Sequence, residues 1–518
     1  MPISITHKIL RNTGWNFVAR IIHIPVSIGL IPFIIGRVGP EWYGVWVALF
    51  ALVDYFSLLD LGMGAATIKY VAEYHASGNL RKIGDVVLST CLFNLIFLPP
   101  LLLCHVFSDE ILAVFKIAPK DFVDVRLIFD GVLLNFAASQ VSGVFRNTLI
   151  GLQRMHVSNF CDIISLAAYA ASTLIVLGSG AGLTAMVVVL FYIRCGIIAM
   201  QVLCLLQAVP ILKHYPGRID MALLREFFRY GLKLQMSSLA GFLNFQMDKL
   251  LIGHFLRMEF VAFYEMGSKL ALVVRYIPSM MLSPLIPAAA ELSVSRDSDR
   301  LEELHRRGTK YLALASAPLM AFMVALGPAV MQVWLGDQST PQAVLALQML
   351  SIGYFFNIVA GAAHSIGRGI GVLKYELQAT GLTTALNLLL SIALIVRFGF
   401  VGALIGTGAA MTVGNLYYVV RFHRFLKAGG SDFFWASIGK PLVCAGVAGG
   451  AMITFLRALG IDTGFASMER SVAFMCLCGS AVAFLVLFLA TLLALKFFTR
   501  ADVEMLGQFR TAIRMIKC

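Results

Sequence analysis

Long apolar runs recur along the whole chain and restrict it to one class of structure. Each run holds about 18 to 25 residues, enough for a helix rising about 1.5 Å per residue to cross a hydrocarbon core about 30 Å thick. The chain is 59% hydrophobic and 13% charged, whereas soluble globular chains carry about 25% charged residues. The sequence therefore predicts an all-α, polytopic membrane protein.

We expect about fourteen membrane-spanning helices. The first run is flanked by Lys8 and Arg11 but lacks a small-residue cleavage site, and further runs follow it. It is therefore interpreted as a retained helix and not as a cleaved signal peptide. The expected ranges are 14–36, 43–62, 84–107, 126–146, 157–178, 183–206, 231–253, 260–286, 312–334, 344–366, 377–397, 400–420, 441–458 and 472–495.

The positive charge of the chain follows the pattern of a membrane protein. The chain has 41 lysines and arginines against 28 acidic residues, which gives a formal net charge of +13. If the N-terminus is cytoplasmic, most of these basic residues fall in the inside loops, in clusters such as those within 213–229 and 296–310. Both termini are therefore expected in the cytoplasm, and no basic cluster is left over for nucleic acid.

An internal repeat relates the first six spans to the next six. LIPFIIG at 30–36 aligns with MDKLLIG at 247–253, and VAEYHASGNLRKI at 71–83 aligns with AAELSVSRDSDRLEEL at 289–304. The offset is about 218 residues in both cases, which indicates duplicated halves of the kind that secondary transporters contain. Because each half has an even number of spans, both halves enter the membrane from the same side, and the repeat is parallel.

This repeat predicts three parts in the chain. Residues 1–215 form an N-terminal six-helix bundle, residues 216–430 form a C-terminal six-helix bundle, and residues 431–518 form two extra membrane helices with a cytoplasmic tail. Halves related by an axis along the membrane normal typically enclose a central substrate site and rock against each other.

The first span carries charge inside an apolar stretch. NFVARIIHIPVSIGLIPFIIG at 16–36 contains Arg20 and His23, although a cation at the centre of a membrane helix costs about 2.5 to 3.5 kcal/mol on insertion scales. On a helix these two residues share a sector of about 60° with Asn16 and Ser27. The helix therefore presents a polar side, which predicts a neighbouring anionic group or a wet cavity.

Further charged residues lie deep in other spans. Lys249 shares a helical face with Gln235, Ser238 and Gln246, so the first helix of the second half also has a polar side. Arg20 and Lys249, one from each half, could hold a diphosphate between them, the arginine as a planar fork and the lysine as a point charge. The candidates for a substrate cavity are Arg20, His23, Asp54, Arg194, Asp248, Lys249 and Arg275.

Structural interpretations of the same charges remain open. Asp54 could be the ion-pair partner of Arg20. Glu265 and Lys269, four residues apart on one helix, could neutralise each other. His23 could carry a proton for coupling to transport, or it could be only hydrogen-bonded.

Two equivalent helices carry matching polar stripes. Small and hydroxylated residues let membrane helices approach closely, which favours a packing role for most members of these stripes. Each stripe ends in an arginine that either snorkels to the lipid headgroups or serves the cavity, so Arg146 and Arg368 are secondary candidates. The stripes are Asn135, Ser139, Ser142 and Arg146 on one helix and Asn357, Gly361, His364 and Arg368 on the other.

The sequence contains no motif for covalent chemistry. Walker A, HExxH and GxSxG patterns are absent, and the expected external loops are short for an enzyme that polymerises or ligates sugars there. Most of the nine cysteines lie inside apolar spans, and none has partners at metal-ligand spacing. We therefore expect neither catalysis nor a bound metal or cofactor, with proton or sodium coupling left open.

Two segments resemble a known family of transporters. They are GPEWYGVWVALFALVDYFSLLDLGMGAATIKYVAEY at 39–74 and FQMDKLLIGHFL at 245–256 followed by FVAFYEMGSKL at 260–270. Over most of residues 9–425 the chain is similar to the polysaccharide (O-antigen, Wzx-type) flippases and exporters of the multidrug/oligosaccharidyl-lipid/polysaccharide superfamily. The second segment departs from the common family form at Glu265.

This resemblance implies a fold, a function and a location. Such proteins use two six-helix bundles to flip a polyprenyl-diphosphate-linked oligosaccharide by alternating access, through an inward-facing cationic cavity and without covalent chemistry. The resemblance also implies the bacterial cytoplasmic (inner) membrane as location. The implied partners are the lipid-linked oligosaccharide, the bilayer, and polysaccharide polymerases or other glycan-assembly membrane proteins. The last two spans are similar to the extra helices of lipid II flippases, which help to form a groove for the lipid tail.

Other functions remain open from the sequence. A cation-coupled multidrug-type exporter would rely on cavity carboxylates, for which Asp54, Asp162 and Asp248 are candidates. A lipid II-type flippase is an alternative within the same superfamily. A membrane enzyme or scaffold of glycan assembly is the alternative from a different class.

Overall fold

The computed structural model of the chain is helical in the part that it describes, and no strand occurs there. This confirms the all-α class that the apolar runs predict. The chain divides into two compact units, Met1–Glu265 and Met266–Cys518, and each is described by itself. The described residues are 5–115, 122–215, 217–426, 432–458 and 469–498, with the backbone alone for 5–21, 122, 222 and 230–245.

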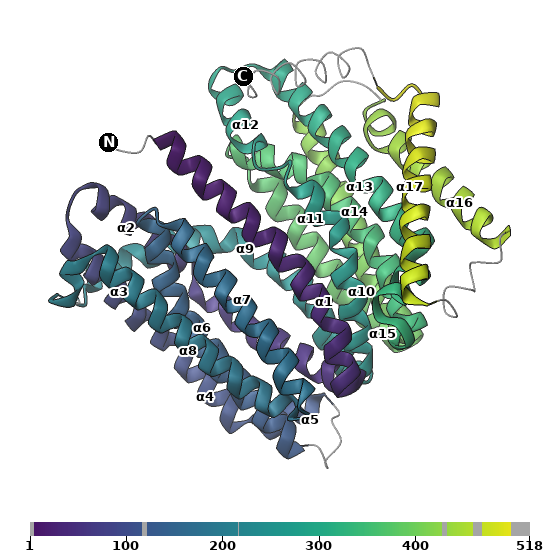
Figure 1. Cartoon of the computed structure of the whole chain (residues 1–518). Helices are drawn as coiled ribbons and strands as arrows, with labels where there is room; N and C mark the ends of the chain where they lie inside the picture. The colour runs from purple at the N-terminus through teal and green to yellow at the C-terminus, as the bar shows by residue number, and fades with distance from the viewer. Residues whose placement is uncertain (1–4, 116–121, 216, 427–431, 459–468, 499–518) are drawn as a thin grey trace. The chain divides into compact units, whose positions relative to one another are not determined.

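The described part of the first unit consists of helices (Figure 1). The α-helices are α1 Ile5–Asp54, α2 Met63–Ala76, α3 Leu80–Phe93, α4 Leu98–Val106, α5 Ser108–Val114, α6 Phe122–Gly151, α7 Met155–Gly178, α8 Gly182–Ala208, α9 Met221–Phe255 and α10 Met258–Ala271, the last of which continues into the second unit. Short 3-10 helices cover Tyr55–Asp60, Asn94–Phe97 and Pro210–Lys213.

The second unit begins within α10 and includes the C-terminal helices. Its α-helices are α11 Val273–Ser279, α12 Leu285–Val294, α13 Ser298–Leu335, α14 Pro341–Gly369, α15 Lys374–Phe425, α16 Lys440–Ala458 and α17 Arg470–Ala494. A 3-10 helix covers Gly336–Gln338, and a π-helix at Trp435–Gly439 precedes α16.

Ten helices of the described part are long and apolar enough to cross a membrane. Two of them, Ile22–Asp60 and Lys374–Phe425, hold 39 and 52 residues, although about 20 residues suffice for one crossing. Each contains one glycine with non-helical backbone angles, Gly39 at φ 81° and Gly399 at φ 59°. Glycine adopts a positive φ without the strain that a Cβ would cause. Each long helix therefore has a kink at its glycine.

The span predicted at 260–286 is interrupted in the structure. α10 ends at Ala271, α11 covers only seven residues, and α12 begins at Leu285. Pro278 lies inside α11, and Pro284 precedes α12. Proline has no backbone N–H to donate and clashes with the preceding helical turn, so the prolines disfavour one continuous helix over this range.

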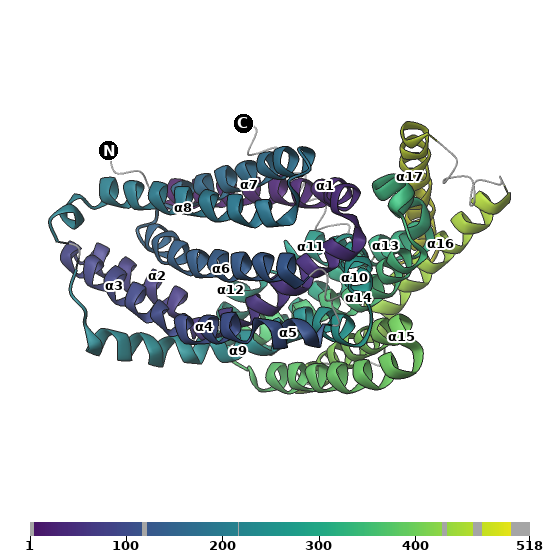
Figure 2. The same ribbon diagram turned by 90° about the horizontal axis from the view of Figure 1, so that it is seen from below.

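Hydrogen bonds and small residues join the helices of the first unit, in which α1 runs along α7 (Figure 2). Between α6 and α8, Asn135 Nδ2 donates to the carbonyl oxygen of Val187 at 2.9 Å. In the same contact, a Cβ on Gly131 would lie 2.6 Å from the Val187 side chain. Elsewhere α2, α3 and α9 share an apolar core in which Tyr70 stacks on Phe227, with ring centroids 4.6 Å apart.

The segment that precedes α9 is fixed to α3. The carboxylate of Asp85, which is buried, accepts hydrogen bonds from Arg218 N at 2.7 Å and from Tyr215 Oη at 3.1 Å. Lys82 Nζ lies 3.4 Å from a carboxylate oxygen of Asp85 and 3.1 Å from one of Asp220. The connection into α9 is therefore a structured part of the first unit.

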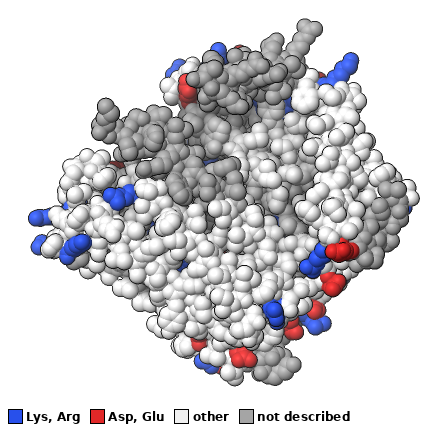
Figure 3. All heavy atoms as spheres, in the orientation of Figure 1, with Lys and Arg blue, Asp and Glu red and all other residues white. Residues whose placement is uncertain are grey.

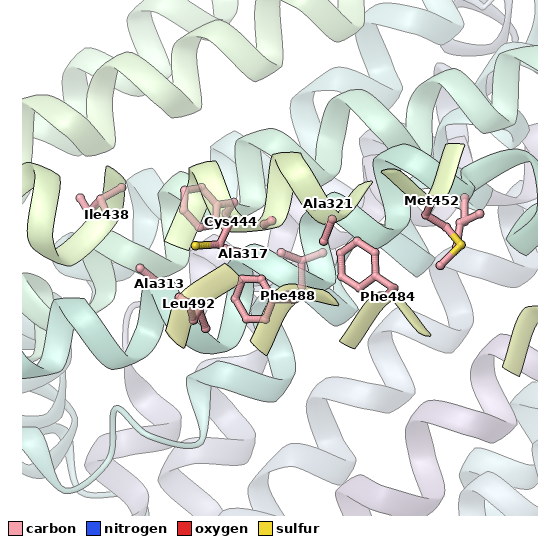
Figure 4. Close-up of a cluster of buried hydrophobic side chains, with 14 of the residues drawn as sticks. Ala313, Ala317, Ala321, Ile438, Cys444, Met452, Phe484, Phe488 and Leu492 are labelled. Atoms are coloured by element: carbon pink, nitrogen blue, oxygen red, sulfur yellow. The ribbon is translucent and has the colours of Figure 1, made fainter. Parts of the chain in front are cut away.

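The second unit is built around α13, which packs against α14, α16 and α17. Every fourth residue in the middle of α13 is an alanine, and large side chains of α17 at the same spacing belong to the same core (Figure 4). The two rows are Ala313, Ala317 and Ala321 on α13 and Phe484, Phe488 and Leu492 on α17. At the helix ends, Arg470 Nη2 donates to the carbonyl oxygen of Leu335 at 3.3 Å, and Lys440 Nζ donates to that of Leu495 at 3.2 Å. The last two helices are thus joined to the second unit.

The surface of the protein suits a hydrocarbon environment. In Figure 3, wide areas of the visible face carry no Lys, Arg, Asp or Glu side chain, and the charged residues lie near its margins. Large apolar side chains are exposed on the long helices, for example Val396 at 71% and Val482 at 65%. Exposed apolar surface of this extent would be unfavourable in water. With the ten long apolar helices, it identifies a multi-pass membrane protein.

The contact between α1 and α10 generates a first prediction. A Cβ on Gly44 would lie 1.8 Å from the carbonyl oxygen of Met258. We expect Gly44→Ala to destabilise the first unit by about 1–3 kcal/mol, because a backbone atom cannot move away as a side-chain rotamer can. Thermal unfolding of the purified protein measures the effect. Gly29→Ala in the same helix is the control, since nothing lies within 4 Å of its Cβ position; equal losses in both variants would contradict this interpretation.

Candidate functional site

Charged candidate residues meet where α9 packs against α10. Lys249 Nζ on α9 lies 2.8 Å from Glu265 Oε2 on α10, and the two side chains are only 14% and 7% exposed. Asp248, the residue before Lys249, accepts a hydrogen bond from Tyr264 Oη at 2.7 Å. Two neighbouring residues of α9 thus bind two neighbouring residues of α10.

α1 contributes a further carboxylate to this region. Gln246 Nε2 on α9 donates to Asp54 Oδ2 at 3.4 Å, and Asp54 is the last residue of α1. The structure therefore brings together three of the predicted candidates, Asp54, Asp248 and Lys249. We call the whole group the α9 polar cluster, which consists of Asp54, Gln246, Asp248, Lys249, Tyr264 and Glu265.

The lysine of the α9 polar cluster has a carboxylate counter-ion. Burying a charge is costly, and removing one partner of a buried ion pair costs about 3–5 kcal/mol because the other charge is left uncompensated. Glu265 provides that compensation for Lys249. The spacing of Glu265 along the chain favours an ion pair with Lys269 on the same helix. The ion pair with Lys249 joins two different helices, and spacing within one helix cannot indicate such a contact.

Three other candidate residues have described side chains on other elements or positions. His23 is exposed on α1, and Arg194 is half-buried on α8. Arg275 is half-buried on α11, in the second unit. The side chain of Arg20 lies outside the described residues, so its pairing with Asp54 and its role in a cavity stay predictions.

Both secondary candidates form ion pairs between consecutive helices. Arg146 on α6 donates from Nε and Nη2 to Asp162 Oδ2 on α7, at 3.2 Å in each case, and the two side chains are 44% and 40% exposed. Arg368 on α14 donates from Nε to Glu376 Oε1 on α15 at 3.1 Å, and the Glu376 side chain is only 8% exposed. Each arginine therefore has a carboxylate partner in addition to any contact with headgroups.

The polar stripes take part in helix packing, as their composition predicts. Ser142 Oγ on α6 donates to Gln201 Oε1 on α8 at 2.9 Å, in the same helix contact as the Asn135 bond. On α14, the ring of His364 stacks on that of Tyr418 on α15, with centroids 4.0 Å apart and an interplanar angle of 9°. These side chains join helices within their own units.

Two acidic residues, Glu265 and Glu376, form ion pairs with candidate residues, and the sequence does not predict these pairs. The sequence does not mark Glu376 as a site residue, although it follows Arg368 by eight residues, across the short connection from α14 to α15. In the sequence, Glu265 is distinguished by its spacing from Lys269 and by its departure from the family form. The sequence contains one signal for the contacts between α9 and α10. Asp248 and Lys249 are adjacent on one predicted span, and Tyr264 and Glu265 are adjacent on the next. Within the described segments, no three His, Cys, Asp or Glu side chains form a potential metal site.

Comparison with known proteins places these residues in a family. Residues 9–293 match the family described as "Polysaccharide biosynthesis protein". A Shigella flexneri protein with the description "Putative O-antigen transporter" is 22% identical over 407 residues, which are 77% of this chain and 94% of that protein. "Probable flippase AglR" of Haloferax volcanii is 23% identical over 466 residues, which are 87% of this chain and 90% of that protein.

A solved structure shares the fold. "Lipid II flippase MurJ, inward closed conformation" aligns with a TM-score of 0.70 at 12% sequence identity, over 93% of this chain and 98% of that one. At this identity the likeness concerns the arrangement of helices alone.

The two arginine pairs generate the second prediction. Arg368→Ala leaves the buried carboxylate of Glu376 without its guanidinium partner, and we expect a loss of about 1–3 kcal/mol. Arg146→Ala should cost only about 0–1 kcal/mol, because its pair with Asp162 is exposed. Thermal unfolding of the purified variants compares them. The double change Arg368→Ala with Glu376→Gln should regain most of the loss; equal effects of the two single changes would show that burial of Glu376 is unimportant.

Proposed function

Because the chain belongs to the polysaccharide biosynthesis protein family, we propose that it is a flippase that moves a polyprenyl-diphosphate-linked oligosaccharide across the bacterial cytoplasmic (inner) membrane. The transported oligosaccharide serves O-antigen, capsule or another surface polysaccharide. The family match carries the proposal, and the descriptions of the two relatives as an O-antigen transporter and a flippase support it. No covalent step is part of the proposed activity.

The proposed mechanism is alternating access between two six-helix bundles, residues 1–215 and 216–430, with two further helices within 431–518. The 50 and 52 residues of α1 and α15 are enough for two crossings each, which raises the ten apolar helices of the described segments to twelve crossings. One crossing by α9 and one by the interrupted range of α10 to α12 bring the proposed total to about fourteen. The shared fold with an inward-closed flippase supports the two-bundle arrangement. Both termini are proposed to lie in the cytoplasm.

The proposed diphosphate ligands are Arg20 and Lys249, with His23, Arg194 and Arg275 as further cavity residues. The low exposure of Lys249 supports this role, because a charge in such a position usually marks a substrate pathway or a structural pair. Coupling to a proton or sodium ion, and a polysaccharide polymerase as partner, belong to the same proposal.

The carboxylates of the α9 polar cluster support a second candidate function. Asp54, Asp248 and Glu265 outnumber Lys249 among the described side chains of the cluster. A cation-coupled multidrug-type exporter would use such carboxylates to bind its coupling ion or a cationic substrate. A lipid II-type flippase is a further alternative with the same fold.

A vesicle assay with the reconstituted protein separates these functions. Movement of lipid-linked oligosaccharide between leaflets, with no glycosyl donor added, supports the proposed flippase. Selective movement of lipid II supports the lipid II-type alternative, and drug efflux supports the exporter. Glycan elongation when a donor is added would contradict the expectation that the protein is not an enzyme. In cells, deletion should cause the lipid-linked intermediate to accumulate and one surface glycan to be lost.

The third prediction concerns Arg20. Arg20→Ala should abolish transport with little loss of protein in the membrane, because removing an intramembrane charge does not impair insertion. Arg20→Lys should recover only part of the activity, since a point charge cannot reproduce bidentate phosphate binding. If Arg20 is instead the structural partner of Asp54, Arg20→Ala should lower abundance, and the double change with Asp54→Ala should restore abundance and transport. Transport by the double variant would therefore contradict substrate binding by Arg20.

The fourth prediction concerns topology. The basic loop clusters place the segment 290–310 in the cytoplasm. A single cysteine at Arg300, whose side chain is 78% exposed, should resist an impermeant thiol reagent in intact cells and react after permeabilisation. A cysteine at Asp109, which is 59% exposed and expected outside, should react in intact cells and serves as the control. Labelling of the Arg300 position in intact cells would refute the topology.

A further inference from the structure

α9 and α10 are joined by two separate polar contacts between neighbouring residues. One is the ion pair between Lys249 Nζ and Glu265 Oε2, at 2.8 Å. The other is the hydrogen bond that Tyr264 Oη donates to Asp248 Oδ2, at 2.7 Å. If the ion pair opens, the second contact can keep the two helices together.

The cost of the ion pair indicates a role beyond packing. Removing two charges from water is expensive, and apolar residues of similar volume are often as stable as a buried ion pair or more stable. The start of α10 is in addition held against α1 by the close approach of Gly44 to Met258. The position of α10 therefore does not depend on the ion pair alone, and the ion pair is available for a different purpose.

The chemistry of Lys249 defines what can replace Glu265. An ammonium group has three donors and no acceptor, so only acceptors bind it, and anionic oxygens bind it most strongly. A diphosphate carries more negative charge and more acceptor oxygens than one carboxylate. It can therefore displace Glu265, whereas a neutral headgroup offers too little attraction to compensate for opening the ion pair.

We propose that Glu265 is an internal competitor for the diphosphate headgroup of the substrate, an inference that rests on the flippase function proposed above. In the empty protein Glu265 neutralises Lys249; when substrate binds, the diphosphate displaces the carboxylate and takes its place. Glu265 thus acts as a specificity-determining residue that rejects weakly charged lipids. Its return to Lys249 promotes release of the substrate after translocation.

The exchange also changes the link between two helices. Displacement of Glu265 removes the ionic contact between α9 and α10 and leaves the bond between Tyr264 and Asp248. A ligand shifts a conformational equilibrium only through a difference in affinity for the two states. The affinity of the diphosphate differs between the two states, because it binds Lys249 only in the state without the ion pair.

The test measures binding of two probes to purified full-length protein. Farnesyl diphosphate represents the lipid-linked headgroup, and inorganic pyrophosphate represents the same chemistry without a lipid. Glu265→Gln should bind farnesyl diphosphate about 10-fold more tightly than the wild type, because the competing negative charge is absent; this change corresponds to about 1.4 kcal/mol. Lys249→Met, alone or combined with Glu265→Gln, should lose this binding. Asp109→Asn, which removes an exposed carboxylate paired with Arg126, is the matched control and should not change affinity.

Transport gives a second measurement of the same exchange. In vesicles, Glu265→Gln should flip lipid-linked oligosaccharide with a lower apparent KM and a lower maximal rate, because release becomes slower. Unchanged or weaker farnesyl diphosphate binding by Glu265→Gln would overturn the proposal and make Glu265 a static counter-ion or a direct ligand. If Glu265→Gln does not fold, Glu265→Asp takes its place, since the shorter carboxylate should compete less well; no gain in affinity by that variant would also overturn the proposal.

The two probes and the flipping assay separate the possible failures. Tighter binding of both probes by Glu265→Gln supports competition at an anion site, and tighter binding of farnesyl diphosphate alone shows that the lipid chain is also recognised. Tighter binding without any flipping of lipid-linked oligosaccharide by the wild type would support the internal competitor and refute the flippase function. If the wild type flips lipid-linked oligosaccharide but Glu265→Gln shows no gain in affinity, the flippase function is supported and the internal competitor is refuted.

Discussion

The hydrocarbon core of a bilayer offers no hydrogen-bond partners, so every backbone group that enters it must be satisfied within the protein. Helices meet this requirement along their own length, and the described part of this chain is built of them. Several departures from regular helix are explained by the residue type. Gly39 and Gly399 adopt positive φ angles inside long helices, and Pro278 and Pro284 accompany the interruption after α10.

The same requirement controls the charged side chains. Lys249 and Glu265 are both largely buried and lie 2.8 Å apart, and the buried Glu376 has Arg368 as its partner. Arg146 and Asp162 are both exposed, so their ion pair competes with water and contributes less. Burial thus distinguishes ion pairs of similar composition: a pair in a low-dielectric environment cannot be opened cheaply unless another charge replaces the lost partner. This property makes the pair in the α9 polar cluster suitable for detecting an anionic headgroup.

Specific contacts also determine which segments belong to which unit. The segment before α9 is bonded to α3 through Asp85 and Lys82, so this connection is not a free tether. The last two helices pack on the alanine row of α13, and Arg470 and Lys440 bind carbonyl groups at helix ends. α16 and α17 are therefore part of the packed second unit, although they lie outside the predicted repeat.

The sequence by itself determined the class of this protein, its family and the polar character of individual helix faces. These are local properties: an apolar run of sufficient length must be helical in a membrane, and spacing along one helix determines which residues share a face. It also identified Asp54, Asp248 and Lys249, which the structure brings together. Only the tertiary structure decided that Lys249 binds Glu265 and that Arg368 binds Glu376. Partners on different helices depend on how those helices rotate and pack against each other, and spacing within a single helix carries no information about that packing.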